Sequence, residues 1–169
     1  EGVRAADACT GSGCVAVTLA KERPHWRVVA ADISKEALAV ARRNAATHGA
    51  DVAFIRCDLL EAFRESAALD AVVSNPPYIG EEEWKTLPAS VRDFEPRAAL
   101  VGGASGAEVI TRLAAQAYAR LRSGGWFFTE ISPLIAARAA EAVKAAGFRV
   151  EEVIRDYANW ERVIAAYKE

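Results

Sequence analysis

Near its amino end the chain reads Asp7-Ala8-Cys9-Thr10-Gly11-Ser12-Gly13-Cys14, a glycine-containing turn between a strand-like run and a helical pattern. The run Val3 to Cys9 is apolar enough for a buried strand, and the pattern Cys14 to Arg23 is that of a helix ended by Pro24. Glycine suits such a turn because it is tight and lets the backbone approach a ligand closely. The stretch therefore predicts the strand-turn-helix unit that opens an α/β fold with a ligand site.

Strands and helices alternate along the rest of the chain. Ser34 is typical of a helix N-cap and Gly49 of the residue after a helix, so we expect a helix between them. Five strand-helix units predict a parallel sheet with helices on both faces, and the last two strands, which no helix separates, should form an antiparallel hairpin. The expected strands are 3–9, 27–31, 52–57, 69–74, 126–131, 149–155 and 162–167, and the expected helices are 14–23, 34–48, 59–65, 107–122 and 133–146.

An irregular stretch from Asn75 to about Gly106 holds four of the six prolines. Loops of this length in compact domains are usually functional or disordered. Within it, Trp84 is expected to pack the loop, whereas Glu95 and Arg97 could either order the loop through a surface ion pair or contact a substrate. Trp126 and Trp160, further on, are expected to pack in the core or in the hairpin.

The composition fits one globular domain, since 52% of the 169 residues are hydrophobic and 26% are charged. A net charge of −2 and a pI near 5.8 argue against tight binding to a nucleic-acid backbone, which needs a clustered basic face. No apolar run approaches the roughly 20 residues that cross a bilayer. Cys9, Cys14 and Cys57 are odd in number and fit no paired zinc motif, so we expect reduced thiols of a cytoplasmic protein and no metal site.

Aspartates lie at the ends of three successive expected strands, at Asp7, Asp32 and Asp58. The carboxyl ends of parallel strands share one edge, where open α/β folds bind ligands. Asp32 is suited to accept hydrogen bonds from both hydroxyls of a ribose, Asp58 from an adenine amino group, and Asp7 can face an ammonium. Together they describe an adenosine that carries a charged amino acid. Because Gly11 and Gly13 also satisfy the dinucleotide-binding pattern, NAD is an alternative ligand, and any single aspartate could be only a helix cap.

The tetrapeptide Asn75-Pro76-Pro77-Tyr78 follows the fourth strand directly and should lie beside that ligand. The side-chain oxygen of Asn75 and the carbonyl of Pro76 can each accept one hydrogen of an NH2 group. The two prolines stiffen the backbone and leave no competing N–H, and Tyr78 can form an aromatic wall against a planar group. This arrangement suits methyl transfer to a planar NH2, an in-line displacement that needs no metal.

These motifs together resemble those of class I methyltransferases that modify planar NH2 groups. Three further segments resemble the HemK/PrmC family of protein-(glutamine) methyltransferases: Phe94 to Leu100 with Gly102, Gly103 and Gly106; Glu130 on the fifth strand; and Arg155-Asp156-Tyr157 with Glu161-Arg162-Val163. The resemblance spans nearly the whole chain. It departs from the family at Cys9, where a glycine is common, and at Ser132. The first departure is expected to matter little if Cys9 keeps ordinary strand dihedrals.

The resemblance implies a class I, Rossmann-like methyltransferase domain over residues 1–169, with a seven-stranded, mostly parallel sheet. It implies S-adenosylmethionine as cofactor and, as substrate, the glutamine of the Gly-Gly-Gln motif in peptide-chain release factors, gripped in part by an N-terminal domain that this chain lacks. The NH2 site would be Asn75, Pro76, Pro77 and Tyr78. The cofactor site would be Asp7, Cys9, Thr10, Gly11, Ser12, Gly13, Asp32, Ile33, Asp58, Leu59 and Asn75.

Other functions stay open on the sequence alone. One is methylation of an exocyclic amine in RNA or DNA, which the acidic pI disfavours. A ribosomal-protein glutamine is another possible target. A third is a domain that binds S-adenosylmethionine only as a scaffold, although such a domain would be expected to lose the residues that hold the NH2 group.

Overall fold

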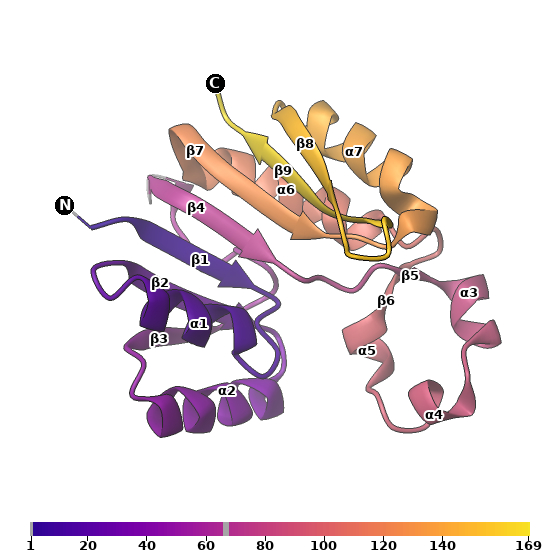
Figure 1. Ribbon diagram of the computed structural model, residues 1–169, viewed down its shortest axis with the longest axis horizontal. Coiled ribbons are helices and arrows are strands. Elements are labelled where there is room, and N and C mark those ends of the chain that lie inside the picture. Colours follow the sequence, from indigo (N-terminus) through magenta and orange to yellow (C-terminus); the bar gives the residue numbers. More distant parts are fainter. Residues whose placement is uncertain (1, 66–67) are drawn as a thin grey trace.

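The computed structural model describes residues 2–65 and 68–169, which form a central sheet with helices on both faces (Figure 1). The seven strands lie in the order β3-β2-β1-β4-β7-β9-β8, the first five parallel and β9 antiparallel to both of its neighbours. The expected sheet and closing hairpin are thus confirmed. The strands are β1 (Arg4–Ala8), β2 (Arg27–Asp32), β3 (Val52–Arg56), β4 (Leu69–Ser74), β7 (Leu121–Glu130), β8 (Arg149–Arg155) and β9 (Glu161–Tyr167).

Two helices cover one half of the sheet and two cover the other half from the opposite face (Figure 1). Helices α1 (Cys14–Glu22) and α2 (Lys35–His48) pack against β1, β2 and β3. Helices α6 (Glu108–Arg120) and α7 (Ala136–Ala145) pack against β7, β8 and β9, and the short η2 (Pro133–Ile135) precedes α7. The predicted caps of α2 are present: the Ser34 hydroxyl accepts from the Ala37 amide at 3.0 Å, and Gly49 has a left-handed φ of 58°.

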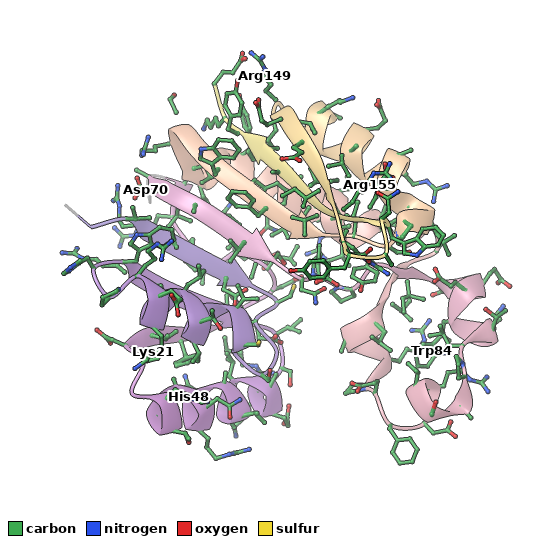
Figure 2. All side chains as sticks on the ribbon, in the orientation of Figure 1. Lys21, His48, Asp70, Trp84, Arg149 and Arg155 are labelled. Atoms are coloured by element: carbon green, nitrogen blue, oxygen red, sulfur yellow. The ribbon has the colours of Figure 1, made fainter. Side chains whose placement is uncertain are left out.

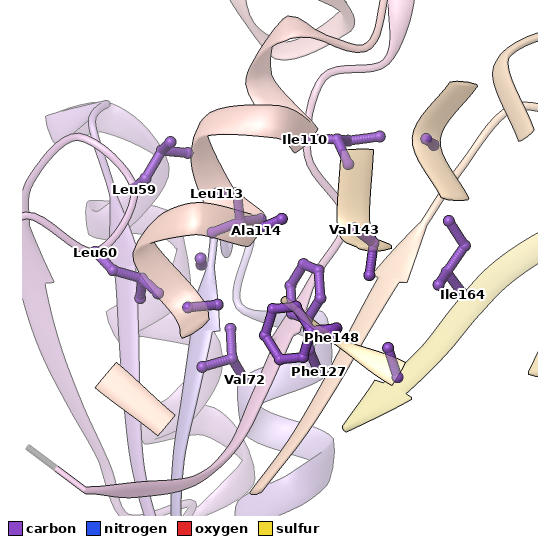
Figure 3. Packing of buried hydrophobic residues seen from close by; sticks show 14 of the residues in the cluster. Leu59, Leu60, Val72, Ile110, Leu113, Ala114, Phe127, Val143, Phe148 and Ile164 are labelled. Atoms are coloured by element: carbon purple, nitrogen blue, oxygen red, sulfur yellow. The ribbon is translucent and has the colours of Figure 1, made fainter. Parts of the chain in front are cut away.

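The main core lies between the sheet and the pair α6 and α7 (Figure 3). Phe127 of β7 is fully buried and stacks on Phe148 with ring centroids 5.2 Å apart. Aliphatic side chains surround this aromatic pair, and burying each of them contributes roughly 1.5–3 kcal/mol. Figure 3 labels Leu59, Leu60, Val72, Ile110, Leu113, Ala114, Val143 and Ile164 among them.

Two predicted elements differ from the structure. Residues 59–63 form hydrogen-bonded turns instead of a helix, since the Glu61 amide donates to the Asp58 carbonyl and the Phe63 amide to Leu60. The expected Ser123-Gly124-Gly125 turn lies inside β7, because β4 pairs first at Leu121 and then skips to Trp126. The segment therefore bulges from a strand that continues on both sides.

The stretch predicted to be irregular contains small regular elements set apart from the main sheet (Figure 1). Strands β5 (Ile79–Gly80) and β6 (Val101–Gly103) pair with each other, and between them run three short helices, which we call the excursion, residues 81–100. Trp84 is half-buried within the excursion, which Figure 2 shows beside the sheet. Arg97 forms an ion pair with Glu81 at 3.0 Å, whereas Glu95 is exposed. The helices are α3 (Glu81–Thr86), α4 (Ala89–Arg92) and α5 (Arg97–Leu100).

Candidate active site

Hydrogen bonds join the carboxyl ends of four neighbouring strands. The Thr10 amide after β1 donates to the Ala31 carbonyl of β2 at 3.0 Å, and the Cys57 amide after β3 donates to Asp32 at 3.1 Å. On the other side of β1, the buried Ser74 hydroxyl at the end of β4 donates to the Ala8 carbonyl at 2.7 Å. These bonds fix the loops after β1, β2, β3 and β4 relative to one another, so the predicted site residues meet at one edge.

The glycine turn after β1 has two glycines with different surroundings. Both are left-handed, Gly11 with φ +55° and Gly13 with φ +82°. A Cβ on Gly13 would lie 2.9 Å from the Cβ of Ala41, so this glycine permits close packing of α1 against α2. A Cβ on Gly11 would meet nothing within 4 Å, because this residue faces open space at the sheet edge.

The expectation for Cys9 is wrong. Its φ is +57°, in the left-handed region rather than that of a strand, and β1 accordingly ends at Ala8. Leu59, after β3, is left-handed too, with φ +50°. Such a conformation costs a non-glycine residue roughly 1–2 kcal/mol, and residues of this kind cluster at functional sites. Burial raises the pKa of the Cys9 thiol to about 12, so this cysteine is protonated at neutral pH and is no nucleophile.

Asp7 is the most deeply buried acid of the site, with 1% of its surface exposed. Its Oδ2 accepts a hydrogen bond from the Thr10 hydroxyl at 2.6 Å and another from the Ala16 amide at 3.0 Å. Loss of hydration on burial raises its pKa from 3.8 to about 6, an effect that the two hydrogen bonds oppose and the nearby Asp32 carboxylate reinforces. Asp7 therefore shapes the glycine turn and places a weakly acidic carboxyl beneath it.

Two backbone amides hold the Asp32 carboxylate, and an arginine side chain holds that of Asp58. Asp32 accepts from the Gly11 amide at 2.8 Å through Oδ2 and from the Ser34 amide at 2.9 Å through Oδ1. A carboxylate has about four acceptor positions, so Asp32 can still receive two hydroxyl donors. Asp58 pairs with Arg112 of α6 at 2.5 Å, which orients its carboxylate.

These residues surround one cavity of about 720 Å³. The predicted residues among its walls are Asp7, Cys9, Thr10, Gly11, Ser12, Asp32, Ile33, Asp58, Leu59, Asn75 and Pro77. Gly13 is not part of the wall, because it packs against α2, and Pro76 and Tyr78 are not part of it either. The sequence thus predicts most of the cavity wall from the loops after β1, β2, β3 and β4.

No local sequence pattern predicts that the residues of the opposite wall line a ligand site. Pro96, Ala98, Ala99 and Val101 come from the excursion and β6, and Val109 and Arg112 come from α6. Small apolar side chains in an irregular stretch do not by themselves indicate a ligand site, and the segment from Phe94 to Leu100 stands out only through its family resemblance. The Arg112 pair with Asp58 joins positions 54 apart in sequence, which no local pattern reveals.

The four residues of the tetrapeptide have different environments. Asn75 is exposed and lines the cavity, Pro77 is half-buried and lines it too, and Pro76 is fully buried behind them. Gly102 supports the backbone from behind, since a Cβ there would lie 2.4 Å from the Pro77 carbonyl oxygen. The polar side chain of Asn75 is therefore presented to the cavity on a backbone that cannot shift easily.

Tyr78 turns away from the cavity wall toward β7. Its hydroxyl donates to Glu130 Oε1 at 3.0 Å, and its ring is half-buried against the main core. Burial, reinforced by the charge of Glu130 and by this hydrogen bond, raises the pKa of the phenol to about 12. Tyr78 is therefore a neutral donor at physiological pH, and its hydroxyl is directed by the hydrogen bond to Glu130.

Two negative findings apply to residues 2–65 and 68–169. Within these ranges, no cluster of three or more His, Cys, Asp or Glu residues is arranged to hold a metal ion. None of the helices described there combines the length and apolarity needed to cross a bilayer.

Comparison with solved structures places this architecture among the class I methyltransferases. The ribosomal protein L11 methylase from Lactobacillus delbrueckii subsp. bulgaricus matches 100% of this chain, covering 72% of its own, with a TM-score of 0.72 at 23% identity. The Thermus thermophilus 16S rRNA N2 G1207 methyltransferase, solved with AdoMet and guanosine, has a TM-score of 0.67 at 19% identity, with 100% of this chain and 38% of its own covered. At these identities the likeness establishes the fold alone.

The chain belongs to the methyltransferase small domain family, whose model matches residues 1–92. Among curated proteins, release factor glutamine methyltransferase from Koribacter versatilis is 45% identical over 157 residues, and that from Rhodopirellula baltica is 38% identical over 165. These matches cover 93% and 96% of this chain, which confirms the resemblance noted in the sequence. They cover 52% and 56% of the relatives, so the chain spans about half their length.

Proposed function

We propose that this domain transfers a methyl group from S-adenosylmethionine to the side-chain amide nitrogen of a protein glutamine, the one in the Gly-Gly-Gln motif of peptide-chain release factors. The observation that carries the proposal is the position of Asn75, an exposed amide on a rigid backbone in the wall of the cavity that holds the three aspartates. The names of the relatives support the choice of substrate.

The cavity has the chemistry that S-adenosylmethionine requires. Three aspartates line it, of which Asp32 would accept from the ribose hydroxyls, Asp58 from the adenine amino group, and Asp7 would face the ammonium of the methionine part. The open space at Gly11 allows the ligand to approach the backbone closely. Bound there, S-adenosylmethionine supplies an electrophilic methyl carbon on a sulfonium.

The protein's own contribution is to orient a poor nucleophile. The lone pair of an amide nitrogen is delocalised into the carbonyl, so the nitrogen attacks only when it is held in line and allowed to rehybridise. The Asn75 side-chain oxygen and the Pro76 carbonyl would each accept a hydrogen bond from one of the two N–H groups and favour that geometry in the transition state. Tyr78, fixed by Glu130, would limit where the planar amide can lie.

The test is a methylation assay with the full-length enzyme, labelled cofactor and a release factor. We expect label on the Gly-Gly-Gln glutamine, and none on a release factor in which that glutamine is alanine. Asn75→Ala should lower kcat by roughly 100- to 1,000-fold, as loss of one transition-state hydrogen bond does. Calorimetry with S-adenosylhomocysteine should show binding within a few-fold of wild type. Labelling that survives the glutamine substitution would remove this substrate.

A protein target is preferred to a nucleic acid because the chain carries a net charge of −2. We further propose that residues 1–169 are the catalytic part of a longer enzyme in which a separate domain helps to grip the release factor. That the relatives are about twice as long supports this division. The reaction would take place in the reducing cytoplasm, in agreement with the three free thiols of Cys9, Cys14 and Cys57.

A further inference from the structure

The turn between β8 and β9 carries two aromatic side chains that point into solvent. Tyr157 is fully exposed, at 113% of its reference surface, and Trp160 is 57% exposed. The packing expected for Trp160 from the sequence is therefore wrong. Tyrosine and tryptophan are enriched where proteins contact one another, because each buries a large area at a low cost in side-chain entropy. Residues 156–160, which we call the hairpin turn, thus form a candidate contact surface.

The hairpin turn is held rigidly by Asp156. Oδ1 of this side chain accepts from the amides of Ala158 and Trp160, both at 2.9 Å, and Oδ2 accepts from Arg162 Nε at 2.8 Å. The backbone closes as well, since the Asn159 amide donates to the Asp156 carbonyl at 2.8 Å and Asn159 has φ +65°, which asparagine tolerates well. A loop fixed in this way loses little entropy when a partner binds.

The hairpin turn is continuous with the tetrapeptide site. Glu130, which holds the Tyr78 hydroxyl, lies opposite Val163 in the β7–β9 ladder. The turn ends at Trp160, just before β9 begins at Glu161, and so lies three residues, or about 10 Å along the strand, from Val163. Figure 2 shows Arg155 at the end of the hairpin that approaches the excursion, whereas Arg149 lies at the far end. A protein that places a side chain beside Asn75 would therefore meet the hairpin turn with its flanking residues.

The charges around the hairpin turn are paired. Arg162 forms an ion pair with Asp156 at 2.8 Å, and Arg155 forms one with Glu161 at 3.1 Å. A surface that stacks nucleobases normally combines aromatic residues with free basic side chains for the phosphates. Here the two arginines face carboxylates, so the surface presents aromatic groups without net charge, which favours a protein partner.

We propose that the hairpin turn is a docking element for the protein substrate, with Tyr157 and Trp160 packing on the segment that flanks the methylated glutamine. This inference rests on the proposed function and adds to it the surface that selects a protein.

The experiment compares the full-length enzyme with its Tyr157→Ala/Trp160→Ala variant on two substrates, an intact release factor and a capped Gly-Gly-Gln tripeptide. The tripeptide carries the glutamine without the chain on either side of the motif, which is the flanking segment that the turn would contact. For the release factor we expect KM to rise at least tenfold with kcat within twofold, and for the tripeptide no change. Ile154→Ala, which removes a 38% exposed apolar side chain from the same hairpin, is the matched control and should behave as wild type.

Each other outcome overturns the docking role. An unchanged KM for the release factor means that the aromatic residues do not touch it. An equal loss of activity on both substrates means that Tyr157 and Trp160 act inside the NH2 site. A Tm lowered by several degrees in the variant shows that the two side chains pack against the enzyme's own remaining residues. Tighter binding of a single-stranded RNA by the wild type than by the variant would assign the surface to nucleic acid. If wild-type enzyme methylates neither substrate, the proposed function fails, and this result is distinct from the others.

Discussion

The buried carboxyl of Asp7 should make the enzyme less stable as the pH rises through the mildly acidic range. Its ordinary pKa of 3.8 applies to the unfolded chain, and burial raises the pKa to about 6 in the folded protein. Between these values the unfolded chain releases the proton while the folded protein keeps it, so the free energy of unfolding falls with rising pH. One pKa unit is worth about 1.4 kcal/mol, so ionised Asp7 costs the folded state about 3 kcal/mol at neutral pH.

Asp7→Asn tests this cost with little change in shape. Both intramolecular hydrogen bonds end on Oδ2, and the amide oxygen of asparagine can accept them in the same place. Urea unfolding of the cofactor-free protein measures the free energy of unfolding of the variant and of wild type. The difference between the two should change by about 2 kcal/mol in favour of the variant between about pH 4.5 and pH 7.5, because most of the titration of Asp7 falls in that range. If the proposed ammonium contact is right, the same variant binds S-adenosylhomocysteine more weakly.

Asp70→Asn is the matched control with the opposite sign. Burial would raise the pKa of Asp70, but hydrogen bonds from the Arg4 amide and the Arg122 side chain outweigh it and hold that pKa below its ordinary value. This carboxylate stabilises the fold above its unfolded pKa, and the contribution is lost as the pH falls through the folded value. The Asp70→Asn variant should therefore have a lower free energy of unfolding than wild type at neutral pH, and the difference should shrink as the pH is lowered. A difference between Asp7→Asn and wild type that does not vary with pH would refute the reasoning for Asp7.

Two further predictions concern the glycine turn and Tyr78. Gly13→Ala should lower the free energy of unfolding by about 2–5 kcal/mol in thermal or urea unfolding, because the left-handed φ is strained and the new methyl meets Ala41 at 2.9 Å. Gly11→Ala, with open space around the new methyl, should lower it by only about 1–2 kcal/mol. The Gly11 variant should, however, bind S-adenosylhomocysteine more weakly, as measured by calorimetry. Glu130→Ala should lower kcat roughly 10- to 150-fold by releasing Tyr78, as expected for a hydrogen bond to a charged group worth about 1.5–3 kcal/mol. Glu130→Gln should restore most of this loss, and equal rates for the two variants would contradict a positioning role.

The sequence predicts those parts of the fold whose causes are local. The strand pattern, the caps of α2 at Ser34 and Gly49, and the unbroken link between β8 and β9 each depend on neighbouring residues, and all appear in the structure. The aspartates were found because parallel strands bring their carboxyl ends to one edge whatever the details of packing.

Features that depend on distant partners were missed or misjudged. The conformation of Cys9 is set by the hydrogen bond from Thr10 to Ala31 in the next strand, which a strand-like local pattern does not reveal. The direction of the Tyr78 side chain depends on Glu130, 52 positions away, which accepts the hydrogen bond from the phenol hydroxyl. Trp160 is exposed because Asp156 fixes the turn through hydrogen bonds, so the aromatic ring is not needed to hold the hairpin together.

The pairing of β5 with β6 has a consequence for how such an enzyme can diversify. The excursion leaves the body at Gly80, the end of β5, and returns at Val101, the start of β6, and these two strands pair in a small parallel ladder. Gly102 of β6 and Gly106 after it pack against the backbone of Pro77 and Tyr78, so the tetrapeptide is supported by residues that follow the excursion. Because Pro96, Ala98 and Ala99 line the cavity, the part of the excursion that can lengthen, shorten or be exchanged while Asn75 and the cavity wall stay in place is residues 81–95.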